Sequence, residues 1–189
     1  MSVHGRLREA HAHLPMYGRE LTQLSLAGVQ STEECLEAVR GCAAGMDAED
    51  PSGARWLLAN GARIAAWERA EWPTRAQLDA ICATRPVAVM SFDHHSLVAN
   101  TAAMRCAGLA EMRGDPEGGV IERDERGSPT GLLLEGASWL VRRAVPEMTG
   151  VERLSAVRRA LAELAALGFV EVDDLMSPPW LGSVLAELE

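Results

Sequence analysis

The sequence predicts an α/β fold, because helical patterns alternate with short apolar runs along most of the chain. Two of these runs, residues 55–59 and 86–92, are typical of buried strands. A clear helical pattern at residues 149–167 leads directly into the alternating strand pattern of residues 169–172, which is typical of an α/β unit. The 189 residues, of which 48% are hydrophobic, suffice for one domain with a core.

The first half of the chain begins with a short strand pattern at residues 9–14. Ser31, followed three residues later by Glu34, forms a capping signal for a helix that we expect to end near residue 44 or 45. Thr74 and Gln77 form a second capping signal, which places another helix before the apolar run at 86–92.

In the second half, Ser96 is expected to cap a helix that Gly108 closes. Residues 120–123 and 131–135 flank a turn-forming segment and predict a β-hairpin. Short helices are expected at residues 137–145 and 180–188.

Composition excludes several classes of protein. The net charge of −9 argues against nucleic acid or an anionic membrane as the main partner, because both require a basic face. The first residues lack an apolar signal core, and no apolar run is long enough to span a membrane, so we expect a cytoplasmic protein. The four scattered cysteines are expected to be free thiols.

The chain contains no lysine, since all 18 basic residues are arginine. Any mechanism that needs a lysine from this chain is therefore excluded. Such mechanisms include a Schiff base, a phosphate-binding loop with its lysine, and a carboxylated lysine that bridges two metal ions.

His11 and His13 are the first candidate site, because alternate residues of a strand lie on the same face. Two neutral imidazoles on one face make half of a divalent-metal site. The alternative is an exposed pair near the N-terminus with no metal.

Polar residues after the strand at 86–92 are the second candidate, because α/β folds place ligand contacts at the carboxyl ends of strands. Asp93 and His95 lie there, and Asp93 could equally cap a helix. Glu135 ends the second strand of the hairpin, where it is expected as a charge at the hairpin end.

Several motifs occur in an order that resembles the amidohydrolase family 3 branch of the metal-dependent amidohydrolases, which includes N-substituted formamide deformylase-like enzymes. The resemblance runs from about residue 5 to residue 175. Its motifs are Glu9-Ala10-His11-Ala12-His13-Leu14, Arg85-Pro86-Val87, Ser91-Phe92-Asp93-His94-His95-Ser96, Asn100 in Ala99–Ala103, Gly118-Gly119-Val120-Ile121, Gly131-Leu132-Leu133-Leu134-Glu135 and Gly168-Phe169-Val170-Glu171-Val172.

The resemblance implies a (β/α)8 barrel with a divalent metal, expected to be zinc, at the carboxyl ends of its strands. It also implies hydrolysis of non-peptide C–N bonds, amide or formamide, in a small-molecule substrate by metal-activated water. His11 and His13 match the metal ligands of the first barrel strand. His95, Asp93 and Glu135 are expected to face the substrate.

The chain departs from the family in length, and the family's catalytic residues cannot be identified in it. We expect an incomplete α/β barrel, one partial domain over residues 1–189. Residues 9–14 would form the first barrel strand, residues 15–165 a long α+β insertion and residues 168–174 the second barrel strand. No histidine follows His95, so the two further histidine ligands that the family takes from later strands are missing.

Two hypotheses follow. The chain is either the N-terminal part of an amidohydrolase, with impaired hydrolysis, or a non-catalytic domain of that origin that binds a small ligand or a partner. Exposed strand edges would favour pairing of chains, including a homo-oligomer.

Overall fold

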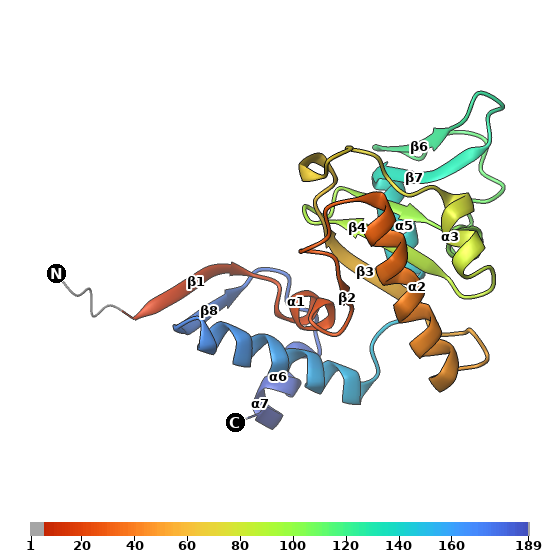
Figure 1. Cartoon of the computed structure of the whole chain (residues 1–189). Coiled ribbons are helices and arrows are strands. Elements are labelled where there is room, and N and C mark those ends of the chain that lie inside the picture. Colours follow the sequence, from red (N-terminus) through yellow and green to blue (C-terminus); the bar gives the residue numbers. More distant parts are fainter. Residues whose placement is uncertain (1–5, 189) are drawn as a thin grey trace. The chain divides into compact units, whose positions relative to one another are not determined.

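The computed structural model describes residues 6–188, which divide into two compact units (Figure 1). The first unit contains the residues up to Thr22 together with those from Glu147 onward, and the second unit contains residues 23–146. Within the described part of the chain, no helix is long and apolar enough to cross a membrane.

The first unit is built on two parallel strands, β1 (Leu7–Ala12) and β8 (Phe169–Asp174), which lie far apart in the sequence and side by side in Figure 1. Three helices complete this unit: α1 (Leu14–Glu20), α6 (Gly150–Ala166) and α7 (Leu181–Leu188). The long α6 helix lies where the sequence predicts a helix, and the structure shows that it begins with a capping box of Thr149 and Glu152.

Close packing of α1 on α6 requires a glycine. A β-carbon at Gly18 would lie 1.9 Å from the carbonyl oxygen of Ala156, so no other residue fits without moving one of the helices. Leu14, Ala160 and Leu164 are buried in the cluster beside this contact. The helix that follows β1 is thereby fixed against the helix that precedes β8.

The second unit contains a six-stranded mixed sheet. In spatial order its strands are β2 (Leu24–Ser25), β3 (Leu57–Ala62), β4 (Val87–Ser91), β5 (Ser96–Ala99), β7 (Pro129–Glu135) and β6 (Gly119–Arg123). The first three strands are parallel, and the last three pair in antiparallel fashion from β4 outward. The remaining elements are α2 (Thr32–Glu49), the 3-10 helix η1 (Ile64–Ala66), α3 (Arg75–Ile81), α4 (Thr101–Cys106) and α5 (Gly136–Ala144).

Helices cover both faces of this sheet, which explains why its central strands are apolar throughout. Val87 and Val89 of β4 pack in one buried cluster with residues of α2 and α3. Ala88 and Met90 of the same strand point to the other face and pack with residues of α4 and α5.

The helix predicted to start at Ser96 is wrong. Residues 96–99 form β5, which pairs with β4 on one side and with β7 on the other. The cap is Asn100, whose side chain accepts a hydrogen bond from the amide of Ala103 at the start of α4. Leu97 and Val98 belong to different core clusters, so the segment alternates as a strand does.

A tight turn joins β4 to β5, and His94 in this turn has a φ of +64°. This left-handed conformation is strained for a residue with a β-carbon. The amide of His94 donates to the carbonyl oxygen of Ser91 at 3.2 Å, as expected for a turn. The strain is therefore local to the reversal of the chain.

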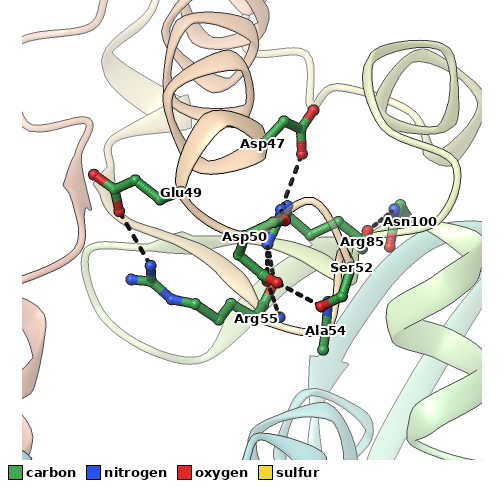
Figure 2. A network of polar contacts seen from close by, with 8 residues as sticks. All are labelled: Asp47, Glu49, Asp50, Ser52, Ala54, Arg55, Arg85 and Asn100. Carbon is green, nitrogen blue, oxygen red and sulfur yellow. Dashed lines mark hydrogen bonds and ion pairs between the residues drawn. The ribbon is translucent and has the colours of Figure 1, made fainter.

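Arg85 is fully buried and anchors the loop after α2 to the start of β4 (Figure 2). Its Nη1 donates to Asp50 Oδ2 at 3.1 Å and to the Arg55 carbonyl oxygen at 2.7 Å. Its Nη2 donates to Asp47 Oδ1 at 2.9 Å and to the Asp50 carbonyl oxygen at 2.8 Å. A buried guanidinium is tolerated because these partners replace water.

Hydrogen bonds from the Ser52 hydroxyl and the Arg55 amide, with help from Arg85, lower the pKa of Asp50 to about 2. Because the pKa in an unfolded chain is near 3.8, this carboxylate stabilises the fold fully above that pH. The contribution is lost as the pH falls toward 2.

Asn100 is buried beside Arg85 and uses all of its side-chain hydrogen-bonding capacity. Its Oδ1 accepts from the amides of Val87 and Ala103 at 3.0 and 2.9 Å. Its Nδ2 donates to the carbonyl oxygens of Cys82 and Arg85 at 2.8 and 2.9 Å. One amide therefore joins the end of α3, the start of β4 and the start of α4.

Replacing Arg85 by methionine should destabilise the chain by about 3 kcal/mol, because the variant leaves the buried carbonyl oxygens of Asp50 and Arg55 without this donor and removes one of the donors to the Asp50 carboxylate. Urea denaturation followed by circular dichroism measures this change. The exposed Arg40→Met on α2 is the matched control and should change stability by less than about 0.5 kcal/mol. Equal stability of the two variants would contradict the role given to Arg85.

At position 94, glycine should be more stable than alanine by about 1 kcal/mol, because only glycine adopts a positive φ without strain. Comparing His94→Gly with His94→Ala removes the side chain in both proteins and isolates the backbone. At the exposed Glu37 of α2 the order should reverse, with alanine the more stable by about 1 kcal/mol. Thermal unfolding of the four variants measures these differences in stability. If glycine and alanine ranked in the same order of stability at positions 94 and 37, the backbone at His94 would not be strained.

Candidate functional site

The predicted site residues lie in both units: His11 and His13 in the first, and Asp93, His95 and Glu135 in the second. In the first unit, parallel pairing brings the carboxyl ends of β1 and β8 together. Ala12 is the register partner of Asp174, and the Leu175 amide donates to the Ala12 carbonyl oxygen at 2.9 Å.

His11 and His13 lie at this carboxyl end and face one another. His11 is the second-last residue of β1, and His13 is the residue that precedes α1. Their ring centroids are 5.1 Å apart, and the rings are nearly perpendicular, at 80°. The pair therefore presents two imidazoles together at a strand end, as the spacing in the sequence predicts.

Asp174 fixes the backbone next to His13. Its Oδ2 accepts from the Leu14 amide at 2.6 Å, the first amide of α1. Its Oδ1 accepts from the Met176 amide at 3.1 Å and from the Ser177 hydroxyl at 2.8 Å. One carboxylate thus joins the end of β8 to the residue that follows the histidine pair. Sequence reasoning missed this role, because the two segments lie 160 positions apart.

The adjacent carboxylate, Asp173, has a different partner. Arg8 of β1 donates from Nε and Nη2 to its two oxygens at 2.9 and 2.8 Å. This contact explains why a charged residue precedes the histidine pair. Both side chains are substantially exposed, so the bidentate pair adds little stability.

The histidine pair fits a divalent metal in part. Nδ1 of His13 is buried and has no hydrogen-bond partner within residues 6–188, and imidazole nitrogens are common ligands of zinc. No group of three or more His, Cys, Asp or Glu side chains in the described residues could hold a metal ion. The pair therefore offers two ligands, whereas catalytic zinc sites use about three from protein.

In the second unit, Asp93 is engaged by its own turn. It accepts from the Ser91 hydroxyl and, at 3.0 Å, from the His95 amide. The Ser91 hydrogen bond is the main reason why the pKa of Asp93 is lowered. Asp93 thus holds the turn in which His95 lies, although not as a helix cap.

His95 and Glu135 form a direct pair across β5 and β7. The His95 Nδ1 lies 2.8 Å from Glu135 Oε2, and the two side chains are 65% and 59% exposed. The hydrogen bond and the charge of Glu135 raise the pKa of His95. Sequence reasoning named both residues but had no means to pair positions 40 apart.

Glu135 has a φ of +50° and is the second described non-glycine residue, besides His94, with a positive φ. Its amide donates to the His95 carbonyl oxygen at 2.7 Å, and its carbonyl oxygen accepts from the Ser138 hydroxyl at 2.7 Å. Arg142 of α5 donates to the His94 carbonyl oxygen at 3.4 Å. The strained residues are thus neighbours, held by backbone contacts on both sides.

The sequence pattern of the amidohydrolase family matches residues 7–183. The Arabidopsis thaliana protein LONG AFTER FAR-RED 3 is 34% identical over 169 residues, which is 89% of this chain and 28% of that protein. The N-substituted formamide deformylase of Arthrobacter pascens is 32% identical over 108 residues, 55% of this chain and 20% of that enzyme.

Among solved structures, an uncharacterized metal-dependent hydrolase from Pyrococcus furiosus is similar, with a TM-score of 0.63 and 25% identity. The likeness covers 97% of this chain and 34% of that structure. The chain therefore spans about a third or less of the length of these similar proteins. It has the mixed α/β fold of part of a metal-dependent hydrolase barrel, as the sequence predicts, and it belongs to the amidohydrolase family.

Proposed function

We propose that this chain is part of a metal-dependent amidohydrolase that hydrolyses non-peptide C–N bonds, amide or formamide, in a small-molecule substrate. The observation that carries the proposal is the pair of imidazoles at the joined carboxyl ends of β1 and β8. The similarity to a formamide deformylase supports the class of bond.

In this proposal His11 and His13 hold a divalent metal, zinc by ligand type. When bound, such a metal lowers the pKa of water and polarises a carbonyl group. Asp174 keeps the backbone beside His13 in place. Residues 9–14 and 168–174 would be the first two barrel strands and residues 15–165 the insertion, an assignment that the parallel pairing of β1 and β8 supports.

His95 and Glu135 are proposed to face the substrate, and Asp93 to hold the turn beside them. A cytoplasmic location and the absence of nucleic-acid or membrane partners stay part of the proposal, consistent with the net charge of −9. Because the described residues offer only two metal ligands, we propose that these 189 residues alone hydrolyse little substrate.

A second candidate function is a non-catalytic domain that binds a small ligand or a partner chain. Within residues 6–188, β1 and β8 pair only with each other, and Leu7 and Val170 on them are more than half exposed. Open strand edges favour pairing between chains, including a homo-oligomer. Light scattering separates this candidate from the amidohydrolase proposal. A non-catalytic binding domain predicts a dimer or a complex, whereas an inactive monomer without ligand would count against it.

Zinc titration by calorimetry tests the metal site. The chain should bind about one zinc ion, and either His11→Ala or His13→Ala should weaken the affinity roughly tenfold or more, because each variant removes one of two imidazole ligands. His94→Ala removes a histidine outside the pair and is the matched control, which should bind as the parent does.

The same preparations should show negligible hydrolysis of N-substituted formamides. Affinity that is unchanged in both His11→Ala and His13→Ala would refute the metal assignment. Stoichiometric zinc with full turnover would instead refute the claim that two ligands are too few.

A further inference from the structure

The His95–Glu135 pair has features that stability does not explain. Both side chains are mostly exposed, and an exposed ion pair contributes little to stability. Yet Glu135 itself and His94, the neighbour of His95, are the described non-glycine residues with positive φ. Strained residues of this kind persist where the surrounding structure holds them, and they cluster at functional sites.

The geometry also assigns different tasks to the two ring nitrogens of His95. Nδ1 faces the Glu135 carboxylate at 2.8 Å, which keeps a proton on Nδ1 because a carboxylate can only accept. Nε2 has no hydrogen-bond partner among residues 6–188, and the side chain is 65% exposed. Nε2 is therefore the atom at which the imidazole gains or loses a proton.

We infer that His95 donates a hydrogen bond from Nε2 to an oxygen acceptor of the ligand, a carbonyl or a carboxylate, and that Glu135 is the positioning residue that fixes the tautomer. The protonated ring carries a hydrogen on both nitrogens, so Nδ1 binds Glu135 while Nε2 donates to that oxygen. Without the proton on Nε2, two acceptors face one another and the contact is lost. The inference deepens the proposed function and rests on it only for the class of ligand.

The charges around His95 support this assignment. Glu135 at the end of β7 and Asp93 in the turn both favour the protonated ring, with Glu135 the larger influence. Arg142 of α5 reaches the His94 carbonyl oxygen and is the nearby positive charge on that element. Because the pKa of His95 is raised, the protonated donor form extends to higher pH than for an ordinary histidine.

The test follows the His95 ring by long-range 1H–15N correlation across pH in the full chain, with His95→Gln to assign the signals. The parent should show Nδ1 protonated in the neutral ring and protonation at Nε2. Glu135→Gln and Glu135→Gly should both lower the titration midpoint. The Glu135→Gly variant should also lose the preference for the Nδ1–H tautomer.

Two variants separate positioning from folding. Glu135→Gly removes the side chain at a positive φ, so its thermal stability should be unchanged or higher while the His95 midpoint falls. Glu125→Gln makes the same change of charge in the exposed hairpin turn and should leave His95 unaltered. A His95 midpoint and tautomer that are equal in the parent and in Glu135→Gly would overturn the inference.

Formate and formamide, added separately, identify the ligand group. A change of the Nε2 shift with formate indicates a carboxylate, and a change with formamide indicates an amide carbonyl. No change with either probe, in a chain that keeps the expected tautomer, would refute the ligand contact. These measurements need no metal. A negative result here would therefore refute the His95 inference without bearing on the metal site that the zinc titration tests.

Discussion

The parallel pairing of β1 with β8 is the constraint on which the candidate metal site depends. The two strands are separated by more than 150 residues, and their register places Ala12 beside Asp174. This register brings the carboxyl ends together, so that Asp174 can bind the first amide of α1. Without it, His11 and His13 would be two polar residues at the end of an isolated strand. The contact of Gly18 with α6 supports the same arrangement from the helical side.

In the second unit, buried polar groups fix the backbone around the start of β4. Arg85 and Asn100 are both buried, and together they join the start of β4 to four neighbouring segments. Because buried polar groups without partners are costly, these contacts define the backbone closely, although the buried Nε of Arg85 has no hydrogen-bond partner among residues 6–188.

Local chemistry in the sequence predicts much of this fold. Ser31 and Thr74 cap helices as predicted, the helix predicted over residues 149–167 is present as α6, and the hairpin around residues 124–128 is present. The prediction for Ser96 failed because a serine after a strand resembles a cap, whereas pairing with two neighbouring strands decides the conformation there.

Contacts between distant positions could not be read from the sequence. The partners of Arg85 lie 30 to 38 positions away, and Glu135 lies 40 positions from His95. The spacing of the sequence made His11 and His13 candidates, the position after a strand and the family resemblance pointed to His95, and the resemblance alone pointed to Glu135. Asp174 was overlooked because its carboxylate binds a backbone amide, that of Leu14, which no sequence motif marks.

X-ray absorption at the zinc edge of the zinc-loaded chain tests the central claim most directly, that the joined strand ends carry a pair of imidazole ligands. The account predicts two imidazole nitrogens at about 2.0–2.1 Å, completed by oxygen ligands. A sulfur ligand at about 2.3 Å, or a shell of oxygens without imidazole scattering, would contradict it.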